Sequence, residues 1–194
     1  MTRSERRTAR IRQALANRQN DLTIVLENVH DPHNVSAVLR TCDAVGVLTV
    51  ELVYTIEKFP RVGRKASSSA TKWVERRKHR SIDDCYQTLR SEGSRLYAAV
   101  IDDRAKSLYD LDCTDRVAFV FGNEHRGVSA EAAAAADATF KIPMMGMIES
   151  LNISVACAVT LYEALRQRLR LPHFPGAQIP DKEMEELLKQ WLRR

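Results

Sequence analysis

The chain lacks the features of a disulfide-linked, zinc-binding or membrane protein. Its four cysteines, Cys42, Cys85, Cys113 and Cys157, are far apart and form no C-x-x-C motif, which argues against a disulfide framework and against a zinc site. No apolar run approaches the roughly 18 residues that a membrane-spanning helix needs. The arginine-rich start has no apolar segment behind it, so we expect no secretory signal. These absences predict a protein of the reducing cytoplasm.

Nucleotide and metal motifs are also missing. The sequence contains neither G-x-x-x-x-G-K-[ST] nor G-x-G-x-x-G, so nucleotide hydrolysis and dinucleotide redox chemistry are poorly supported. His30 and His33 are three residues apart, but no carboxylate or thiol cluster completes a ligand set around them. We therefore expect no metal site.

Positive charge is segregated along the chain. The net charge is only +5, yet residues 1–20 hold six arginines and one glutamate, and residues 58–80 hold nine lysines or arginines and one glutamate. Segregated basic surface indicates a polyanionic partner, and nucleic acid is the one we expect. The plainer alternative is a solvated helix face and a basic loop. The expected RNA contacts are Arg3, Arg7, Arg10, Arg61, Arg64, Lys65 and Lys72.

Hydrophobic patterning alternates between strand and helix periods, which predicts an α/β protein with a parallel sheet covered on both faces. We expect one central domain over 21–170, a basic helical extension over 1–20 and a second extension over 171–194, whose helix Asp181 would cap. The basic, serine-rich stretch between 57 and 72 has no periodicity, and we expect it to be mobile. The expected strands are 22–27, 48–53, 95–101, 117–121 and 139–142, and the expected helices are 3–18, 35–45, 82–92, 129–136, 151–170 and 181–192.

Three segments at strand ends carry more polar chemistry than connections need. Parallel sheets bind ligands at the carboxyl ends of their strands. Asn34 and Arg40 follow the first strand, and a later strand stops on Gly122, where the backbone can approach a ligand closely. The third segment, 143–154, holds three methionines and an amide where a plain turn would be charged. The plainer alternative for it is a buried connection with packed methionines and a Ser150 cap.

Together the three segments resemble the motifs of the SPOUT-class RNA 2′-O-methyltransferases. The resemblance spans about 21–170 and implies a parallel sheet with a deep C-terminal trefoil knot, a homodimer, and transfer of a methyl group from S-adenosylmethionine to a ribose. The basic N-terminal helix and the additional C-terminal helix are most similar to the members that methylate guanosine 18 in the tRNA D-loop. The matching segments are Asn34-x5-Arg40, Phe121-Gly122-Asn123-Glu124-x2-Gly127 and Ile142-Pro143-Met144-x-Gly146-x3-Ser150-Leu151-Asn152-x-Ser154.

The same resemblance assigns roles to residues. Arg40 is the implied catalytic group, but an arginine is protonated essentially always, so we expect it to clamp a phosphate and the developing alkoxide rather than act as a base. Two alternatives stay open: a ribosomal RNA methyltransferase of the same family, and a non-catalytic RNA-binding module. The implied catalytic set is Arg40, Asn34, Glu124, Ser150 and Asn152, and the implied cofactor set is Ala99, Gly122, Ile142, Met144 and Leu151.

Overall fold

The computed structural model describes residues 2–60, 72–172, 174 and 179–194 of the 194. Its centre is a seven-stranded sheet in the order β3-β2-β1-β6-β4-β7-β5, in which all neighbouring strands are parallel. This confirms the α/β prediction. The strands are β1 (Leu22–Glu27), β2 (Thr49–Val53), β3 (Glu75–His79), β4 (Arg95–Ala99), β5 (Lys106–Ser107), β6 (Val117–Phe121) and β7 (Ala138–Lys141).

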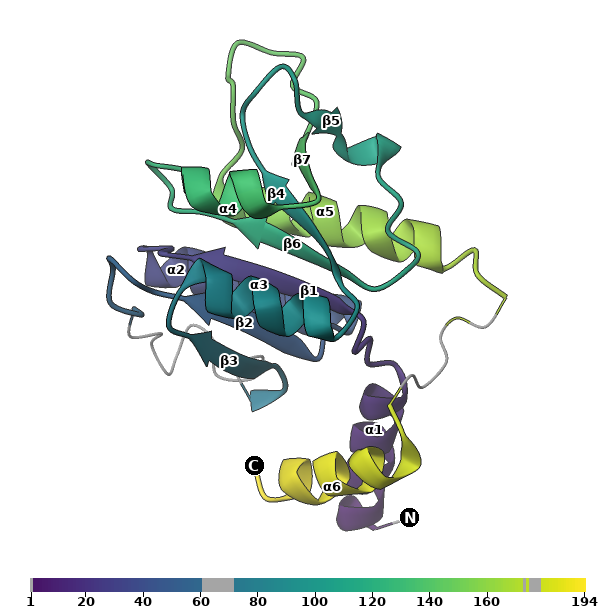
Figure 1. Ribbon diagram of the computed structural model, residues 1–194. Coiled ribbons are helices and arrows are strands. Elements are labelled where there is room, and N and C mark those ends of the chain that lie inside the picture. The colour runs from purple at the N-terminus through teal and green to yellow at the C-terminus, as the bar shows by residue number, and fades with distance from the viewer. Residues whose placement is uncertain (1, 61–71, 173, 175–178) are drawn as a thin grey trace.

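Helices cover both faces of the sheet. Helices α2 and α5 lie on one face, and α3 and α4 lie on the other (Figure 1). The central strands β1 and β6 are buried along their whole length, as expected of parallel strands between two helical layers. The helices are α1 (Arg3–Ala16), α2 (Pro32–Val45), α3 (Ile82–Ser91), α4 (Ala130–Ala135), α5 (Ile153–Arg168) and α6 (Asp181–Leu192), with a 3-10 turn η2 (Leu108–Asp110).

Helices α1 and α6 pack against each other beside the amino ends of the strands (Figure 1). Ile11 and Leu15 of α1 are buried in one cluster with Trp191 of α6. Ala14, which the sequence pattern places on the same side, is exposed. The predicted Asp181 cap is wrong: Pro180 holds the N-cap position and Asp181 is the first helical residue. There its carboxylate faces the positive end of the helix dipole.

Sequence patterning missed two short edge strands, β3 and β5. The five residues of β3 are Glu-Arg-Arg-Lys-His, so no apolar alternation marks them as a strand. Pairing with β2 supplies the backbone hydrogen bonds, and the buried Glu51 accepts two hydrogen bonds from Arg77, at 2.9 and 2.8 Å, and lies 2.6 Å from the His79 ring. Tertiary contacts, rather than local propensity, make this segment a strand.

Candidate active site

Helix α2 presents two of the predicted catalytic residues. Asp31 caps its start by accepting a hydrogen bond from the His33 backbone N–H at 2.8 Å, and Pro32 occupies the first turn. Asn34 follows in that turn and is buried, whereas Arg40 is exposed further along the helix. The helix therefore places an amide in the protein interior and a guanidinium on its surface.

Glu124 joins the loop after β6 to the start of α2. Its carboxylate accepts hydrogen bonds from the backbone N–H groups of His30 and Asp31 at 2.9 and 3.0 Å, and from Asn34 Nδ2 at 2.9 Å. Desolvation by itself would raise the pKa of the Glu124 carboxyl, but these hydrogen bonds outweigh it and hold the pKa below its ordinary value. Glu124 is therefore an ionised acceptor at neutral pH.

Asn152 brings the third segment to the same place. Its Nδ2 donates to Asn34 Oδ1 at 3.0 Å, and its Oδ1 accepts from the Ser154 backbone N–H at 2.8 Å and from the Ser154 hydroxyl at 2.7 Å. Asn152 thus caps α5. We call the series Ser154–Asn152–Asn34–Glu124 the amide chain. It connects all three segments that the sequence singled out, at the carboxyl ends of β1, β6 and β7.

The plainer alternative for segment 143–154 is wrong in two respects. The cap of α5 is Asn152, and Ser150 is exposed outside the amide chain. The methionines do not form a packed core either, because Met145 and Met147 are 95% and 100% exposed. Of the three methionines in this segment, Met144 is the one that is half-buried.

Asn28, a residue that the sequence analysis did not single out, holds the loop after β2 in place. It has a left-handed backbone (φ 52°), and its Oδ1 accepts hydrogen bonds from the backbone N–H groups of Thr55, Ile56 and Glu57 at 3.0, 3.0 and 3.1 Å. Its backbone carbonyl accepts from Asn123 Nδ2 at 2.9 Å. An asparagine directly after a strand was the available signal, since asparagine tolerates this conformation and bonds to nearby backbone.

Glu57 extends this connection to the edge of the site. It pairs with Arg126 at 3.0 Å and lies 3.3 Å from the His30 ring. The hydrogen bond from Arg126 is the main reason that the pKa of the Glu57 carboxyl is lowered. The loops after β1, β2 and β6 are thus held together by side chains.

The turn after β6 also requires a glycine at position 122 for steric reasons. A Cβ at this position would lie 1.9 Å from the Gly127 backbone oxygen. The two strands of this turn are tied by hydrogen bonds between Asn123 and Gly127 in both directions, at 3.0 and 2.8 Å. The absent side chain allows the turn to fold tightly against itself.

The predicted cofactor residues line the ends of neighbouring strands. Ala99 ends β4, Gly122 follows β6 and Ile142 follows β7, and these three strands are adjacent in the sheet. Ala99 and Ile142 are half-buried and pack against the core. Met144 and Leu151 are also half-buried. Half-buried apolar side chains beside backbone groups at strand ends form a suitable wall for a small organic ligand.

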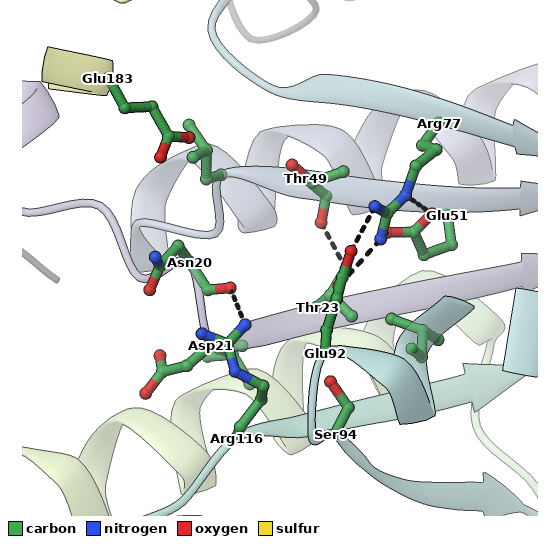
Figure 2. A pocket seen from close by; sticks show the side chains of 13 residues that line it. Asn20, Asp21, Thr23, Thr49, Glu51, Arg77, Glu92, Ser94, Arg116 and Glu183 are labelled. Atoms are coloured by element: carbon green, nitrogen blue, oxygen red, sulfur yellow. Dashed lines mark hydrogen bonds and ion pairs between the residues drawn. The ribbon is translucent and has the colours of Figure 1, made fainter. Parts of the chain in front are cut away.

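A cavity of about 230 Å³ lies at the opposite edge of the sheet, near the amino ends of the strands (Figure 2). Its polar wall is largely paired within itself: Arg77 bonds Glu51 and Glu92, and Arg116 donates to the Asn20 carbonyl at 2.7 Å. None of the predicted catalytic or cofactor residues lines it.

Basic residues of the two charged windows have different surroundings. Arg3, Arg7 and Arg10 are exposed on α1, and Lys72 is exposed just before β3. Arg7 also donates to the Leu192 carbonyl at 3.1 Å. Within the described part of the chain there is no cluster of metal-ligating side chains and no helix long and apolar enough to cross a membrane. Arg61, Arg64 and Lys65, and the stretch expected to be mobile, fall in or mostly in 61–71, outside the described residues.

Comparison with known proteins gives consistent matches. Residues 21–162 match the model of the SpoU rRNA Methylase family. The chain is 43% identical to a tRNA (guanosine(18)-2′-O)-methyltransferase of Thermus thermophilus, covering 99% of this chain and 98% of that protein, and 41% identical to the Escherichia coli K12 enzyme of the same name, covering 94% and 80%. Among solved structures, the A. aeolicus TrmH/SpoU tRNA modifying enzyme matches with a TM-score of 0.92 and 34% identity over 98% of this chain and 96% of that one.

Proposed function

Because the chain belongs to the SpoU rRNA Methylase family, we propose that it methylates the ribose 2′-hydroxyl of guanosine 18 in the D-loop of tRNA, with S-adenosylmethionine as methyl donor. The amide chain carries this proposal, since it assembles the three motif segments into one site at the carboxyl edge of the sheet. The relatives that share nearly the full length are named for guanosine 18 of tRNA rather than for ribosomal RNA.

The cofactor would lie against Ala99, Gly122, Ile142, Met144 and Leu151. These residues fit such a ligand, because they offer half-buried apolar surface beside the backbone at three adjacent strand ends. When bound, S-adenosylmethionine supplies an electrophilic methyl group on a sulfonium. Apolar walls and backbone amides suit an adenine and a ligand that is itself positively charged.

The protein side chains must make a neutral hydroxyl react. The planar, cationic fork of Arg40 would hold a phosphate and stabilise negative charge as it develops on the ribose oxygen. Asn34 and Asn152 would orient this edge of the site through the amide chain, and the ionised Glu124 would hold the start of α2 in place. Ser150, exposed in the adjoining loop, would contact the nucleotide.

RNA capture would use basic groups outside this site. We assign phosphate contacts to two sets, one on α1 and one in the second charged window. Counterion release from RNA then supplies much of the binding free energy. These groups are Arg3, Arg7, Arg10, Arg61, Arg64, Lys65 and Lys72.

The proposal also covers the domain bounds, the knot and the oligomeric state. The methyltransferase domain would span 21–170 with a deep trefoil knot in its C-terminal half, flanked by the extensions 1–20 and 171–194. Two chains would pair through α5, where Val155 and Tyr162 are 46% and 53% exposed and Leu169, at the C-cap, is 60% exposed. Exposed apolar side chains on one helix suit a protein interface. Light scattering of the purified protein would measure its molar mass in solution and so test the dimer. We also propose that the enzyme is located in the cytoplasm.

One experiment tests the function directly. Unmodified tRNA transcript is incubated with the purified protein and S-adenosylmethionine, and the methylated ribose is mapped. We expect one modified position, guanosine 18, and no product when guanosine 18 carries a 2′-deoxyribose. Methylation of ribosomal RNA but not tRNA would support the family and contradict the substrate; cofactor binding without methylation of either RNA would contradict the enzyme.

A further inference from the structure

The edge strand β3 divides its cations between two faces. Arg77 and His79 face Glu51, whose side chain is 1% exposed, and Arg77 also bonds Glu92 at 2.6 Å. Arg76 and Lys78 alternate with them and are exposed. Among the described residues, no carboxylate forms an ion pair with Arg76 or Lys78. One face of the strand therefore uses its charge for folding, and the other leaves it available for a ligand.

The exposed face of β3 is the face that carries the catalytic helix. In the sheet register, Arg76 is opposite Val50 and Lys78 is opposite Leu52. Val50 and Leu52 belong to the core cluster that includes α2 residues such as Val38. Register partners in a sheet point to the same side. Arg76 and Lys78 thus lie on the same side of the sheet as α2, the helix of Asn34 and Arg40.

The amino end of β3 is attached to the terminal helices. Arg194, the second residue after α6, bonds the Lys72 carbonyl and pairs with Glu75 at 2.6 Å. Trp73 packs against Trp191 of α6, with ring centroids 5.1 Å apart. Figure 1 shows β3 at the sheet edge between this helical pair and the rest of the sheet. The strand begins where the basic extension α1 is docked.

The carboxyl end of β3 reaches the edge of the active site. Its last residue, His79, is level with Val53 of β2, which is level with Glu27 of β1. The loop after β1 contains His30 and Asp31, the residues that bond Glu124. Five strand residues span about 16 Å, so β3 bridges the terminal helices and the catalytic edge.

We infer that Arg76 and Lys78, extended by the exposed Lys72 and Arg80 on either side, form a track for RNA phosphates that leads from the terminal helices to the site on α2. Alternate side chains on a strand are about 6.6 Å apart, a separation comparable to that of neighbouring phosphates in an extended RNA strand. The inference rests on the proposed function, because it takes RNA as the substrate. Phosphate contacts of this kind position the RNA without reading its sequence.

The test is the salt dependence of tRNA binding by the full chain, measured by fluorescence anisotropy. Each phosphate contact makes the slope of log K against log salt concentration more negative by about 0.7 for a single strand and about 0.9 for a duplex. We expect Arg76→Gln and Lys78→Gln each to flatten the slope by about that amount, and the double variant by about twice as much. The KM for tRNA should rise while the turnover at saturating tRNA stays unchanged.

A matched control is Lys106→Gln, which removes an exposed cation from β5 at the opposite edge of the sheet. Its salt slope should equal that of the unmodified protein. If the double variant behaves like Lys106→Gln, the track does not exist, even in an enzyme that methylates tRNA normally. Conversely, if no RNA is methylated but the β3 variants still flatten the slope, the proposed function fails and the RNA contact stands.

Discussion

Arg40 and Glu124, two residues of the proposed active site, carry opposite charges, and neither type of group is suited to exchange a proton there at neutral pH. An arginine does not lose its proton in this range, and Glu124 is held ionised by three hydrogen bonds. In the proposed mechanism, activation of the ribose hydroxyl therefore depends on charge stabilisation and positioning. For these individual residues, the position of each polar group matters more for the proposed reaction than its pKa.

Substitutions of Arg40 distinguish the effect of its positive charge from the effect of its planar guanidinium. Arg40→Ala should lower the single-turnover methylation rate by about 10²- to 10³-fold, the usual cost of losing one preorganised transition-state donor. Arg40→Lys should recover little of that rate, because an ammonium has no planar fork. The rates are measured at saturating tRNA and cofactor. Near-normal methylation by Arg40→Lys would show that bidentate geometry is irrelevant and that the clamp role is wrong.

The turn after β6 can adopt its conformation only with a glycine at position 122. Gly122 leaves room for the Gly127 carbonyl, and this turn carries Asn123 and Glu124 into their hydrogen bonds. A side chain at this position would push the turn away from α2. The order of the proposed active site thus depends on a backbone contact within a single turn.

Gly122→Ala should therefore destabilise the protein. A Cβ placed 1.9 Å from a backbone oxygen cannot be accommodated without backbone movement, and we expect a loss of more than about 3 kcal/mol in the free energy of unfolding. Urea denaturation followed by circular dichroism measures it. Gly146→Ala is the control, since a Cβ there would meet nothing within 4 Å; equal stability of the two variants would contradict the steric argument.

Considered as a whole, the molecule joins its two termini into one helical unit beside the sheet. Trp191 is 1% exposed and packs between Trp73 and the Arg18 guanidinium, which lies 5.1 Å from its ring centroid. Arg18 also bonds the Asp43 side chain and the Val47 carbonyl at the C-terminal end of α2. The terminal helices are therefore anchored both to β3 and to α2.

Trp191→Ala tests this anchoring. Truncating a buried tryptophan typically costs about 3–5 kcal/mol, and here the loss should fall mainly on α1 and α6. Amide hydrogen exchange should become faster in those helices while β1 and β6 stay protected. Lys189→Ala, an exposed change on the same helix, should leave exchange unaltered. Equal protection of α1 and α6 in both variants would show that Trp191 does not hold them.

Sequence patterning by itself determined the alternation of strands and helices and located the three motif segments. It could do so because buried strands and amphipathic helices leave apolar periods that are local in sequence. Asn34, Glu124 and Asn152 were identifiable for a related reason: they are polar residues at the ends of apolar strands or at the start of an apolar helix. The hydrogen bonds that join them could not be predicted, because they connect residues about 90 and 118 positions apart.

Only the tertiary structure decided what each charge does. Arg76 and Arg77 are adjacent in a uniformly basic stretch, yet one is exposed and the other is paired with Glu51 and Glu92. No local pattern distinguishes them, since the carboxylates come from β2 and the end of α3. Pairing with β2 also makes this charged segment a strand. Apolar periodicity predicts burial from residues that are close in sequence. Whether a cation forms an ion pair depends instead on which carboxylates the fold places beside it.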